Sequence, residues 1–541
     1  MSFLGKAKHS SGEKEQDESK AVQMKDSNRR PLTIKPPTKL DIIRYRYHHG
    51  CNFGSVFVLE RWLTPSAFLQ NARPDQTSEL AAVSMAVEKF GIRDTQKAFD
   101  KRWDEALSYQ LLDWLSAKAY CTSIRLPIGY FTLGPKYCSG TPFEPYGDVY
   151  AHAWKVVKKL VKTLWKEEIG VLIDFHALPG GANKEEHSGT NSGKAELWSN
   201  ARYRELAISC LQFIASEISH MDGIIGLQIV NEADHGAADI IDWYDKAIHA
   251  ISSIDRTLPV YISDSWDLPA AIDYIQRMDL NHRDDSCPVC IDTHFYACFS
   301  EADKACWPQQ IIANVPTQLS ALDGKDGNVV DCGAAQVIVG EYSCVMSQES
   351  WSKAGCPEFS SEGRHLISEF GHAQSVRWQQ RAGGSYFWTL AMDWQGGAWG
   401  FTDQVDASNI TPPRNFLSSY YVVQRAISQA QAQYNLQQEQ RLNEHINYWN
   451  KTCPGEHFEH WRFEEGFKVG WNDAMSFFRM KNKSCKPGGG DRIGMLDLWV
   501  RKRIIDSGMK GKFVWEFEHG LRTGIKDFES CAEVETLPLE V

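Results

Sequence analysis

Eight short apolar runs recur between about residues 40 and 430, and amphipathic stretches separate them. The runs are rich in Val, Ile and Phe, whereas the stretches between them, such as FDKRWDEALSYQLLDWLSAKA, have the spacing of helices with one apolar face. In order, the runs are RYHHGCNFGSVF, TSIRLPIGY, GVLIDFHA, IIGLQIVNE, PVYISDSW, CIDTHFY, QVIVGEYS and SYFWTLAMD. This alternation predicts an α/β fold with a parallel sheet, and eight runs are the number that closes a (β/α)₈ TIM barrel.

The pattern changes at both ends of the chain. Residues 1–36 are polar, mixed in charge and nearly free of aromatic side chains, which predicts a disordered tail. After residue 432 come long, charged helices rich in Trp, and two segments there, HWRFEEGFKVGWNDAM and VWEFEHGLRTGIKDFE, align without gaps. We therefore expect a barrel at residues 37–432 and, at 433–541, a C-terminal helical accessory region with a two-copy pseudo-repeat.

Glycines spaced four apart occur in both copies of this pseudo-repeat, at Gly466 and Gly470 and at Gly520 and Gly524. Glycines on one helix face let two helices approach closely, so we expect the copies to be a packed helix pair. The pair is either a cap on the barrel or a binding or dimerisation module.

Polar or titratable residues stand at the ends of six of the eight runs. They are Arg125, Asp174 with His176, Asn231 with Glu232, Asp264, His294 with Tyr296, and Glu341. In a (β/α)₈ barrel the carboxyl ends of all strands lie on one face, where the following loops build the active site. The positions therefore favour a catalytic centre over scattered surface charge.

Composition narrows the classes of partner. A formal net charge of −11 disfavours nucleic acid, since phosphate binding needs clustered Lys and Arg. The 19 Trp suit either sugar stacking or a large aromatic core. No run of about 18 apolar residues predicts a membrane span, and the first residues lack the apolar core of a signal peptide, so we expect a cytoplasmic protein whose protein partners are unknown.

The 14 Cys are expected to be mostly reduced and buried in that compartment. Cys287 and Cys290 form a lone CPVC motif, and no second pair at suitable spacing completes a zinc site. We therefore expect no metal site and no cofactor.

Glu232 and Glu341 are the candidate catalytic pair. Cleavage of a glycosidic bond with retention needs one carboxyl group that protonates the leaving oxygen and a second, about 5 to 5.5 Å away, that attacks the anomeric carbon. Glu232 follows the fourth run and Glu341 the seventh, nearly across a barrel from each other. A single strand-end Glu is often a salt-bridge partner, but the pair predicts a glycoside hydrolase.

The sequence resembles glycoside hydrolase family 5, and within it the fungal exo-β-1,3-glucanases. The similar segments run in the same order from about residue 45 to 425, namely HHGCNFGSVFVLERWLTPSAF, IRLPIGYF, DFHALPG, VNE, DTHFYACF, VGEYS and FWT. The resemblance does not extend to the accessory region.

The resemblance implies a role for each matching residue. Glu341 is the implied nucleophile, which Arg125 holds ionised and oriented, and Glu232 is the general acid/base, with Asn231 bonding the sugar 2-OH. The other implied substrate-binding residues are Glu60 on the outer hydroxyls of the terminal glucose, His176, His294 and Tyr296 around the first sugar, Trp388 beneath it, Phe299 at the entrance, and Asn191 in TNSG. Glu60 is the residue that implies exo action.

Two departures from the family pattern concern the site. Residues 181–190, GANKEEHSGT, form a longer and more charged loop that lacks the family's phenylalanine, and Ala233 stands where proline is common. Because of this loop, the sequence does not define which leaving group the site accepts. The candidate substrates are β-1,3-glucan or its oligosaccharides, a glucolipid or another β-glucoside. Two rival functions remain, a catalytically silent barrel that binds glycan or protein, and a transglycosylase that uses the same intermediate.

Overall fold

The structure, a computed structural model, describes residues 34–390, 392–480 and 489–534. The segment predicted as a tail, 1–36, lies almost entirely outside these ranges. Pro36–Val541 forms one compact unit, and its described residues carry both the barrel and the C-terminal helices.

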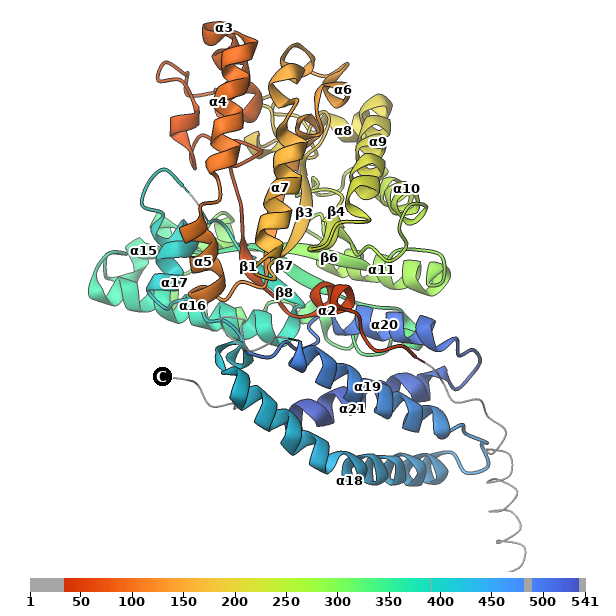
Figure 1. Cartoon of the computed structure of the whole chain (residues 1–541). Helices are drawn as coiled ribbons and strands as arrows, with labels where there is room; N and C mark the ends of the chain where they lie inside the picture. Colours follow the sequence, from red (N-terminus) through yellow and green to blue (C-terminus); the bar gives the residue numbers. More distant parts are fainter. Residues whose placement is uncertain (1–33, 391, 481–488, 535–541) are drawn as a thin grey trace, which may run out of the picture. The chain divides into compact units, whose positions relative to one another are not determined.

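Eight parallel strands close a barrel in the order β1 to β8, with β8 pairing back to β1 (Figure 1). They are β1 His48–Asn52, β2 Ser123–Gly129, β3 Gly170–Ala177, β4 Ile224–Gln228, β5 Val260–Ser263, β6 Val289–Ala297, β7 Val337–Met346 and β8 Gly384–Phe387. Each predicted run overlaps one of these strands, in the predicted order. The expected (β/α)₈ TIM barrel is confirmed.

Helices follow the strands and surround the barrel. In the barrel part they are α2 Lys39–Tyr45, α3 Glu79–Phe90, α4 Ile92–Glu105, α5 Tyr109–Ala117, α6 Pro135–Cys138, α7 Ala153–Trp165, α8 Glu196–Ser199, α9 Ala201–Ile218, α10 Ile240–Ser252, α11 Leu268–His282, α12 Glu301–Ala305, α13 Pro308–Asn314, α14 Val329–Cys332, α15 Gln348–Ala354, α16 Ser361–Arg381 and α17 Phe401–Asp406. The C-terminal helices are α18 Tyr420–Thr452, α19 Trp461–Arg479, α20 Leu496–Ser507 and α21 Val514–Cys531. Within the described ranges, no helix combines the length and the apolarity that a membrane crossing requires.

The strand ends near the predicted catalytic residues are irregular. The β6–β7 register shifts between Thr293 and His294, which sets His294 opposite Glu341. Such shifts bend a strand and redirect its side chains. They bring an imidazole and a carboxylate together at the carboxyl end of the barrel.

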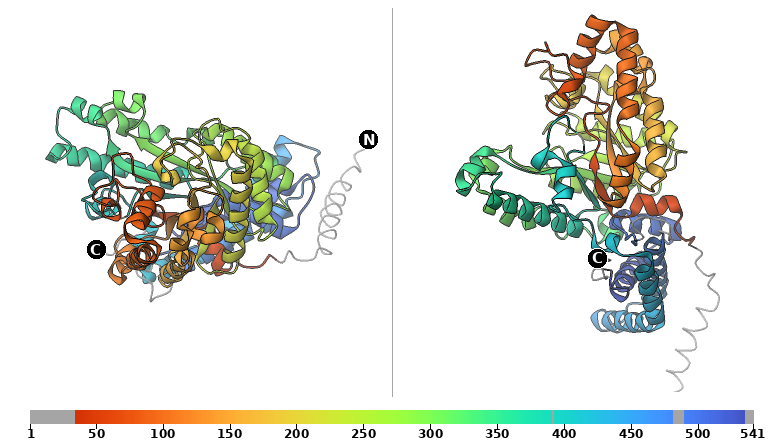
Figure 2. Two further views of the ribbon diagram at one scale, coloured as in Figure 1. Left: turned by 90° about the horizontal axis from the view of Figure 1, so that it is seen from above. Right: turned by 60° about the vertical axis from the view of Figure 1, so that its left-hand side comes forward.

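The C-terminal helices contact the opposite, amino-terminal end of the strands. Arg46, two residues before β1, forms an ion pair with Asp491 at 3.2 Å, and both side chains are buried. Glu518 of α21 accepts the backbone N–H groups of Val329 and Val330, at 2.9 and 2.8 Å, at the start of α14. The further views place α2, in red, beside α20, in blue (Figure 2).

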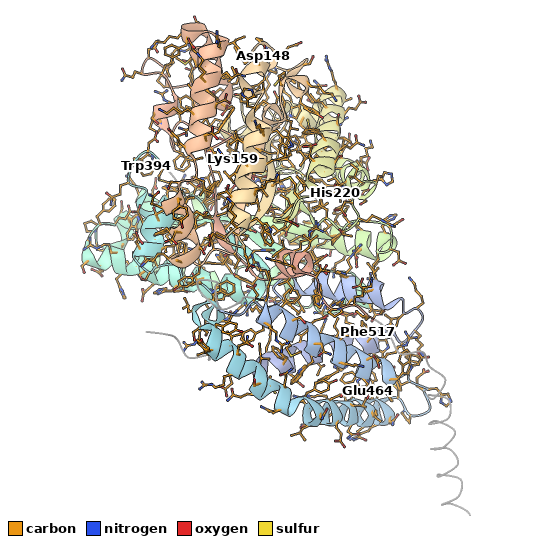
Figure 3. The ribbon with its side chains drawn as sticks, in the orientation of Figure 1. Asp148, Lys159, His220, Trp394, Glu464 and Phe517 are labelled. Atoms are coloured by element: carbon orange, nitrogen blue, oxygen red, sulfur yellow. The ribbon has the colours of Figure 1, made fainter. Side chains whose placement is uncertain are left out.

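Helices α19 and α21, marked by Glu464 and Phe517 in Figure 3, pack with the glycines of each helix against the backbone of the other. A Cβ added to Gly466 would lie 2.1 Å from the carbonyl oxygen of Phe517, and one added to Gly520 would lie 2.0 Å from that of Phe463. Since Phe463 and Phe517 are equivalent in the pseudo-repeat, each copy makes the same contact with the other. The glycines allow backbone-to-backbone packing that a side chain would prevent.

Candidate active site

A cavity of about 630 Å³ opens at the carboxyl end of the barrel. Its lining includes Glu232 and Glu341 together with Glu60, Trp62, His176, Glu185, Glu186, His187, Trp266, Tyr296, Phe299, Trp388 and Trp399. Aromatic walls with a few carboxylates and imidazoles are typical of a small-molecule site. Of the predicted site residues, all except Asn191 line this cavity or bond to a residue that does.

Glu341 is held at both carboxylate oxygens. Its Oε1 accepts from Arg125 Nη1 at 2.9 Å, and its Oε2 accepts the hydroxyl of Tyr296 at 2.7 Å. Burial and the neighbouring Glu341 charge raise the pKa of Tyr296 well above its usual range, so the phenol remains a donor. Two donors therefore fix the orientation of this carboxylate in the cavity wall.

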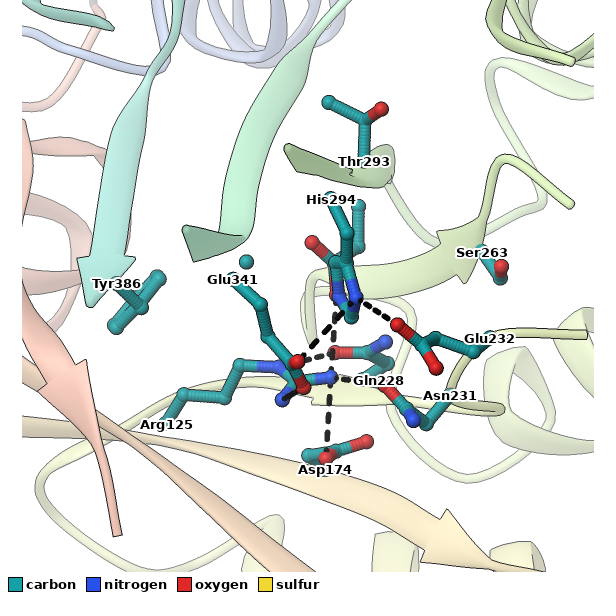
Figure 4. Close-up of polar contacts among 12 residues, drawn as sticks. Arg125, Asp174, Gln228, Asn231, Glu232, Ser263, Thr293, His294, Glu341 and Tyr386 are labelled. Atoms are coloured by element: carbon teal, nitrogen blue, oxygen red, sulfur yellow. Dashed lines mark hydrogen bonds and ion pairs between the residues drawn. The ribbon is translucent and has the colours of Figure 1, made fainter. Parts of the chain in front are cut away.

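Arg125 anchors this arrangement from below (Figure 4). Its guanidinium is fully buried and also donates to Gln228 Oε1 at 2.9 Å, Asn52 Oδ1 at 2.8 Å and Asn231 Oδ1 at 2.7 Å. Two more carboxylates, Asp174 and Asp292, lie 3.1 and 3.3 Å from Nη2. A planar guanidinium serves several acceptors at once, which a lysine ammonium does not.

Glu232 sits just beyond β4 with a positive φ of 41°. That conformation is strained for a residue with a side chain, and such strain concentrates at functional sites. His294 Nδ1 lies 2.7 Å from Glu232 Oε1, and His187 Nε2 lies 3.1 Å from Oε2. Burial alone would raise the pKa of Glu232, but the hydrogen bonds from His187 and His294 outweigh it and hold the pKa well below its usual range.

The two candidate catalytic carboxylates are close. One ligand atom each of Glu232, His294 and Glu341 lies within 4.8 Å of the others, so an oxygen of Glu232 is within that distance of an oxygen of Glu341. His294 Nδ1 lies between them, 2.7 Å from Glu232 Oε1 and 3.5 Å from Glu341 Oε2. The arrangement brings two carboxylates close enough to act on the same bond.

The remaining predicted residues surround this pair. Trp388 is nearly buried and stacks on His176, with ring centroids 5.9 Å apart and an interplanar angle of 9°. His176 bonds Asp174 Oδ2 through Nδ1 at 2.6 Å. Glu60 is buried and accepts from Trp62 Nε1 at 2.9 Å, and burial raises its pKa to about 7. Phe299 is exposed at the mouth.

Asn191 does not reach the cavity. Its Oδ1 accepts the N–H groups of Thr77 and Ser78, at 3.2 and 3.0 Å, and its Nδ2 donates to Thr77 Oγ1 at 2.6 Å. These bonds fasten the end of the long loop to the start of α3. The structure therefore gives Asn191 a structural contact instead of the substrate contact that the resemblance implies.

His187, from the long loop 181–190, is the main residue that the sequence reasoning missed. Asn183 anchors this loop by donating to the carbonyl oxygen of Glu232 at 3.0 Å, and Trp198 Nε1 donates to that of Ala182 at 2.8 Å. Burial lowers the pKa of His187, but the bond and charge of Glu232 prevail and raise it to about 9. The charged, lengthened loop was the signal, although nothing in it singled out His187.

Other missed residues fall into two groups. Asp292 lies two residues before His294 on β6, so strand periodicity puts both on one face, and His294 Nε2 lies 3.2 Å from Asp292 Oδ2. Trp62, Trp266 and Trp399 are loop aromatics in the cavity lining. In the sequence, only the high number of Trp residues indicated that such loop aromatics line the site.

Comparisons with known proteins identify the family. The family described as "Cellulase (glycosyl hydrolase family 5)" matches residues 83–372, and "Glucan 1,3-beta-glucosidase 3 C-terminal domain" matches residues 430–532. A glycosyl hydrolase of Saccharomyces cerevisiae, described as uncharacterized, is 30% identical over 514 residues, covering 91% of this chain and 94% of the relative. Glucan 1,3-beta-glucosidase 3 of Schizosaccharomyces pombe is 29% identical over 486 residues, covering 89% of this chain and 95% of the relative.

Among solved structures, rutinosidase from Aspergillus niger superposes with a TM-score of 0.52 at 15% identity, covering 68% of this chain and 99% of that one. This likeness concerns the fold. The family 5 model spans more than half of the chain, and the S. cerevisiae relative extends over nearly all of it. The chain therefore belongs to glycoside hydrolase family 5 and is a glycosidase.

Proposed function

We propose that the protein is a retaining, exo-acting β-glucosidase that releases glucose from β-1,3-glucan, its oligosaccharides or other β-glucosides. The observation that carries the retaining mechanism is the distance of at most 4.8 Å between an oxygen of Glu232 and one of Glu341. Retaining enzymes hold their carboxyl groups about 5 to 5.5 Å apart, whereas inverting enzymes leave about 6.5 to 9.5 Å for a water molecule.

In this mechanism the Glu341 carboxylate attacks the anomeric carbon while Glu232 gives its proton to the leaving oxygen, and the glycosidic C–O bond breaks. Glu232, now a carboxylate, takes a proton from water, whose oxygen attacks the same carbon and releases Glu341. Arg125 and Tyr296 fix the nucleophile throughout, so little reorganisation is needed.

Exo action is supported by Glu60, a buried carboxylate in the cavity wall that matches the family's contact to the terminal sugar. The named relative from S. pombe supports the β-1,3-glucan preference. Exposed Trp266 and Phe299 in the cavity lining favour a second class of substrate, β-glucosides with an apolar aglycone, because aromatic faces bind apolar surfaces.

The test is product analysis on a β-1,3-glucan, its oligosaccharides, and aryl and alkyl β-glucosides. We expect glucose as the first product, appearing as the β-anomer in proton NMR before mutarotation. Early mid-length oligosaccharides would refute exo action, and an initial α-anomer would refute retention. Transfer to added sugar acceptors measures transglycosylation, and lack of turnover on every substrate would favour the silent binding barrel.

Glu60→Gln tests the exo subsite separately. Losing a charged hydrogen-bonding partner costs about 1.5 to 3 kcal/mol, so kcat/KM should fall roughly 10- to 150-fold. Glu185→Gln, which changes an exposed carboxylate of the same lining, is the control and should change little. Equal effects from the two variants would argue against a specific role for Glu60.

A further inference from the structure

A second cluster of titratable side chains lies in the C-terminal helices, away from the barrel site. His445 lies on α18, His460 directly precedes α19, and Glu516 lies on α21. His445 Nε2 and His460 Nδ1 are each 2.9 Å from the same oxygen, Glu516 Oε2. All three atoms lie within 4.8 Å of one another.

The cluster is not a by-product of the pseudo-repeat. In the alignment of the two copies, His460 corresponds to Val514 and Glu516 corresponds to Arg462. The repeated residues, above all the glycines, build the α19–α21 contact, whereas the cluster uses positions at which the copies differ. Close helix packing therefore does not by itself account for this set of side chains.

Burial makes the cluster chemically unusual. Glu516 and His445 have almost no exposed surface, and Glu516 Oε1 is already occupied by the backbone N–H of Glu459 at 2.8 Å. The remaining oxygen, Oε2, faces two imidazoles. Within the described part of the chain, His445 Nδ1 is buried without a hydrogen-bond partner. A buried polar atom without a partner is costly, so the protein does not fully meet the hydrogen-bonding capacity of this ring.

We propose that His445, His460 and Glu516 form a site for a divalent transition metal, with Zn²⁺ the best match. Two imidazole nitrogens and one carboxylate oxygen are ordinary zinc ligands at about 2.0 to 2.2 Å. Tetrahedral ligands at that distance are about 3.3 Å apart, so each 2.9 Å pair has to widen by only a few tenths of an ångström. The cation takes the place of the hydrogen bonds between the imidazoles and the carboxylate, and it neutralises the buried carboxylate.

The surroundings allow access and a fourth ligand. The side chain of His460 is 19% exposed, which opens the cluster to solvent on one side. The ring centroid of His519, an exposed residue on α21, is 5.2 Å from that of His445, so His519 or water completes the coordination. The ligands come from α18, α21 and the segment before α19, so the metal ties these three segments together.

The experiment uses the full chain after dialysis against a chelator. Co²⁺ is titrated while visible absorption is followed, and Zn²⁺ binding is measured by calorimetry. We expect one equivalent with the absorption bands of tetrahedral Co²⁺ and no sulfur charge-transfer band. Because a ligand that binds only the folded state stabilises it, Zn²⁺ should also raise the Tm.

Glu516→Gln keeps the side-chain shape and should weaken binding about 100-fold or more and abolish the Tm shift. His460→Gln, at the partly exposed edge, carries the same test if Glu516→Gln fails to fold. His365→Gln, which alters an exposed His–Glu pair on α16, is the matched control and should bind as wild type does.

Glu341→Gln separates this site from the barrel carboxylates and should leave the metal affinity unchanged. The proposal is overturned if the wild-type chain takes up no Co²⁺, if both cluster variants bind as wild type does, or if Glu341→Gln removes the binding. The cluster would then be a hydrogen-bonded clamp between helices.

Discussion

His187 Nε2 lies 3.1 Å from Glu232 Oε2, so the loop 181–190 delivers an imidazole directly to the proposed acid/base. His294 occupies the other oxygen at 2.7 Å. Burial works against ionisation, yet the two imidazoles hold the pKa of Glu232 well below its usual range, while Glu232 raises the pKa of His187 to about 9. The directions of both pKa shifts favour the proton on His187, whereas a general acid needs it on Glu232.

The proton required for leaving-group departure is thus shared between His187 and Glu232, and the pair titrates as one unit. The form with the proton on Glu232 has the same net charge as the form with it on His187, so raising the pH removes the active form only when the pair loses that proton. In the wild-type enzyme we expect the alkaline limb of kcat/KM near pH 9.

In His187→Gln the limb should move at least one pH unit lower, because the proton reservoir at His187, with its pKa of about 9, is lost and His294 still lowers the pKa of Glu232. His235→Gln, in the adjacent loop where Nδ1 bonds the carbonyl oxygen of Ser265, is the control and should leave the pH profile in place. An unchanged alkaline limb in a folded His187→Gln enzyme would remove His187 from the proton path.

The strand-end residues of the site were predictable from the pattern of runs, and the loop residues Glu60 and Phe299 only through the family resemblance, whereas His187 was not predicted. Parallel strands in a barrel bring their carboxyl ends together, so Arg125, Glu232, His294 and Glu341 follow from the order of runs alone. The position of His187 depends instead on tertiary bonds, such as that from Asn183 to the carbonyl oxygen of Glu232. No local pattern encodes such a bond.

The same distinction holds in the C-terminal helices. Glycines four residues apart predict a close helix contact, because they lie on one helix face and have no side chain to keep a second helix away. The cluster of His445, His460 and Glu516 joins positions up to 71 residues apart on separate helices. Their convergence becomes visible only once the helices are packed.

Replacing Arg125 by Lys tests the anchoring of the nucleophile. Lysine keeps the charge but loses the fork that reaches Glu341, Asn52 and Asn231 together. A misplacement of about 1 Å can cost 10²-fold, so kcat/KM should fall about 100-fold or more. Leaving buried carboxylates poorly compensated should also destabilise the fold by up to about 3 to 5 kcal/mol.

Arg46→Lys is the matched control, since Arg46 is also a buried, ion-paired arginine but lies at the other end of the barrel. It should lose comparable stability in denaturant unfolding while keeping kcat/KM per folded molecule. If the two variants lose activity equally, the effect of Arg125 is one of folding and not of nucleophile positioning.

Gly524→Ala tests the packing of the accessory helices. A Cβ there would lie 2.2 Å from the carbonyl oxygen of Phe467, which belongs to backbone that cannot move alone. Alanine favours a helix over glycine by about 1 kcal/mol, whereas overpacking costs about 1 to 3 kcal/mol or more, so the clash should prevail. We expect a lower Tm, and Lys526→Ala on the exposed side of α21 should stay within about 0.5 kcal/mol of wild type. A Gly524→Ala protein as stable as wild type would mean that the helices need not approach so closely.

The last prediction separates the two glutamates, because a nucleophile and an acid/base fail in different ways. Glu341→Ala should abolish turnover on every substrate, since no glycosyl-enzyme can form, and added azide should attack the open face to give the α-glycosyl azide. Glu232→Ala should impair natural glucosides but spare the first step for aryl glucosides, whose leaving groups need little protonation. Azide should then accelerate the second step and give the β-glycosyl azide.

General-acid assistance contributes about 10² to 10⁴ in rate, so the difference in rate between poor and good leaving groups should be of that order in Glu232→Ala and absent in Glu341→Ala. Initial rates on both substrate classes, with NMR of the azide products, decide the matter. Opposite behaviour of the two variants would reverse the assignment, and wild-type rates in both would place the chemistry elsewhere.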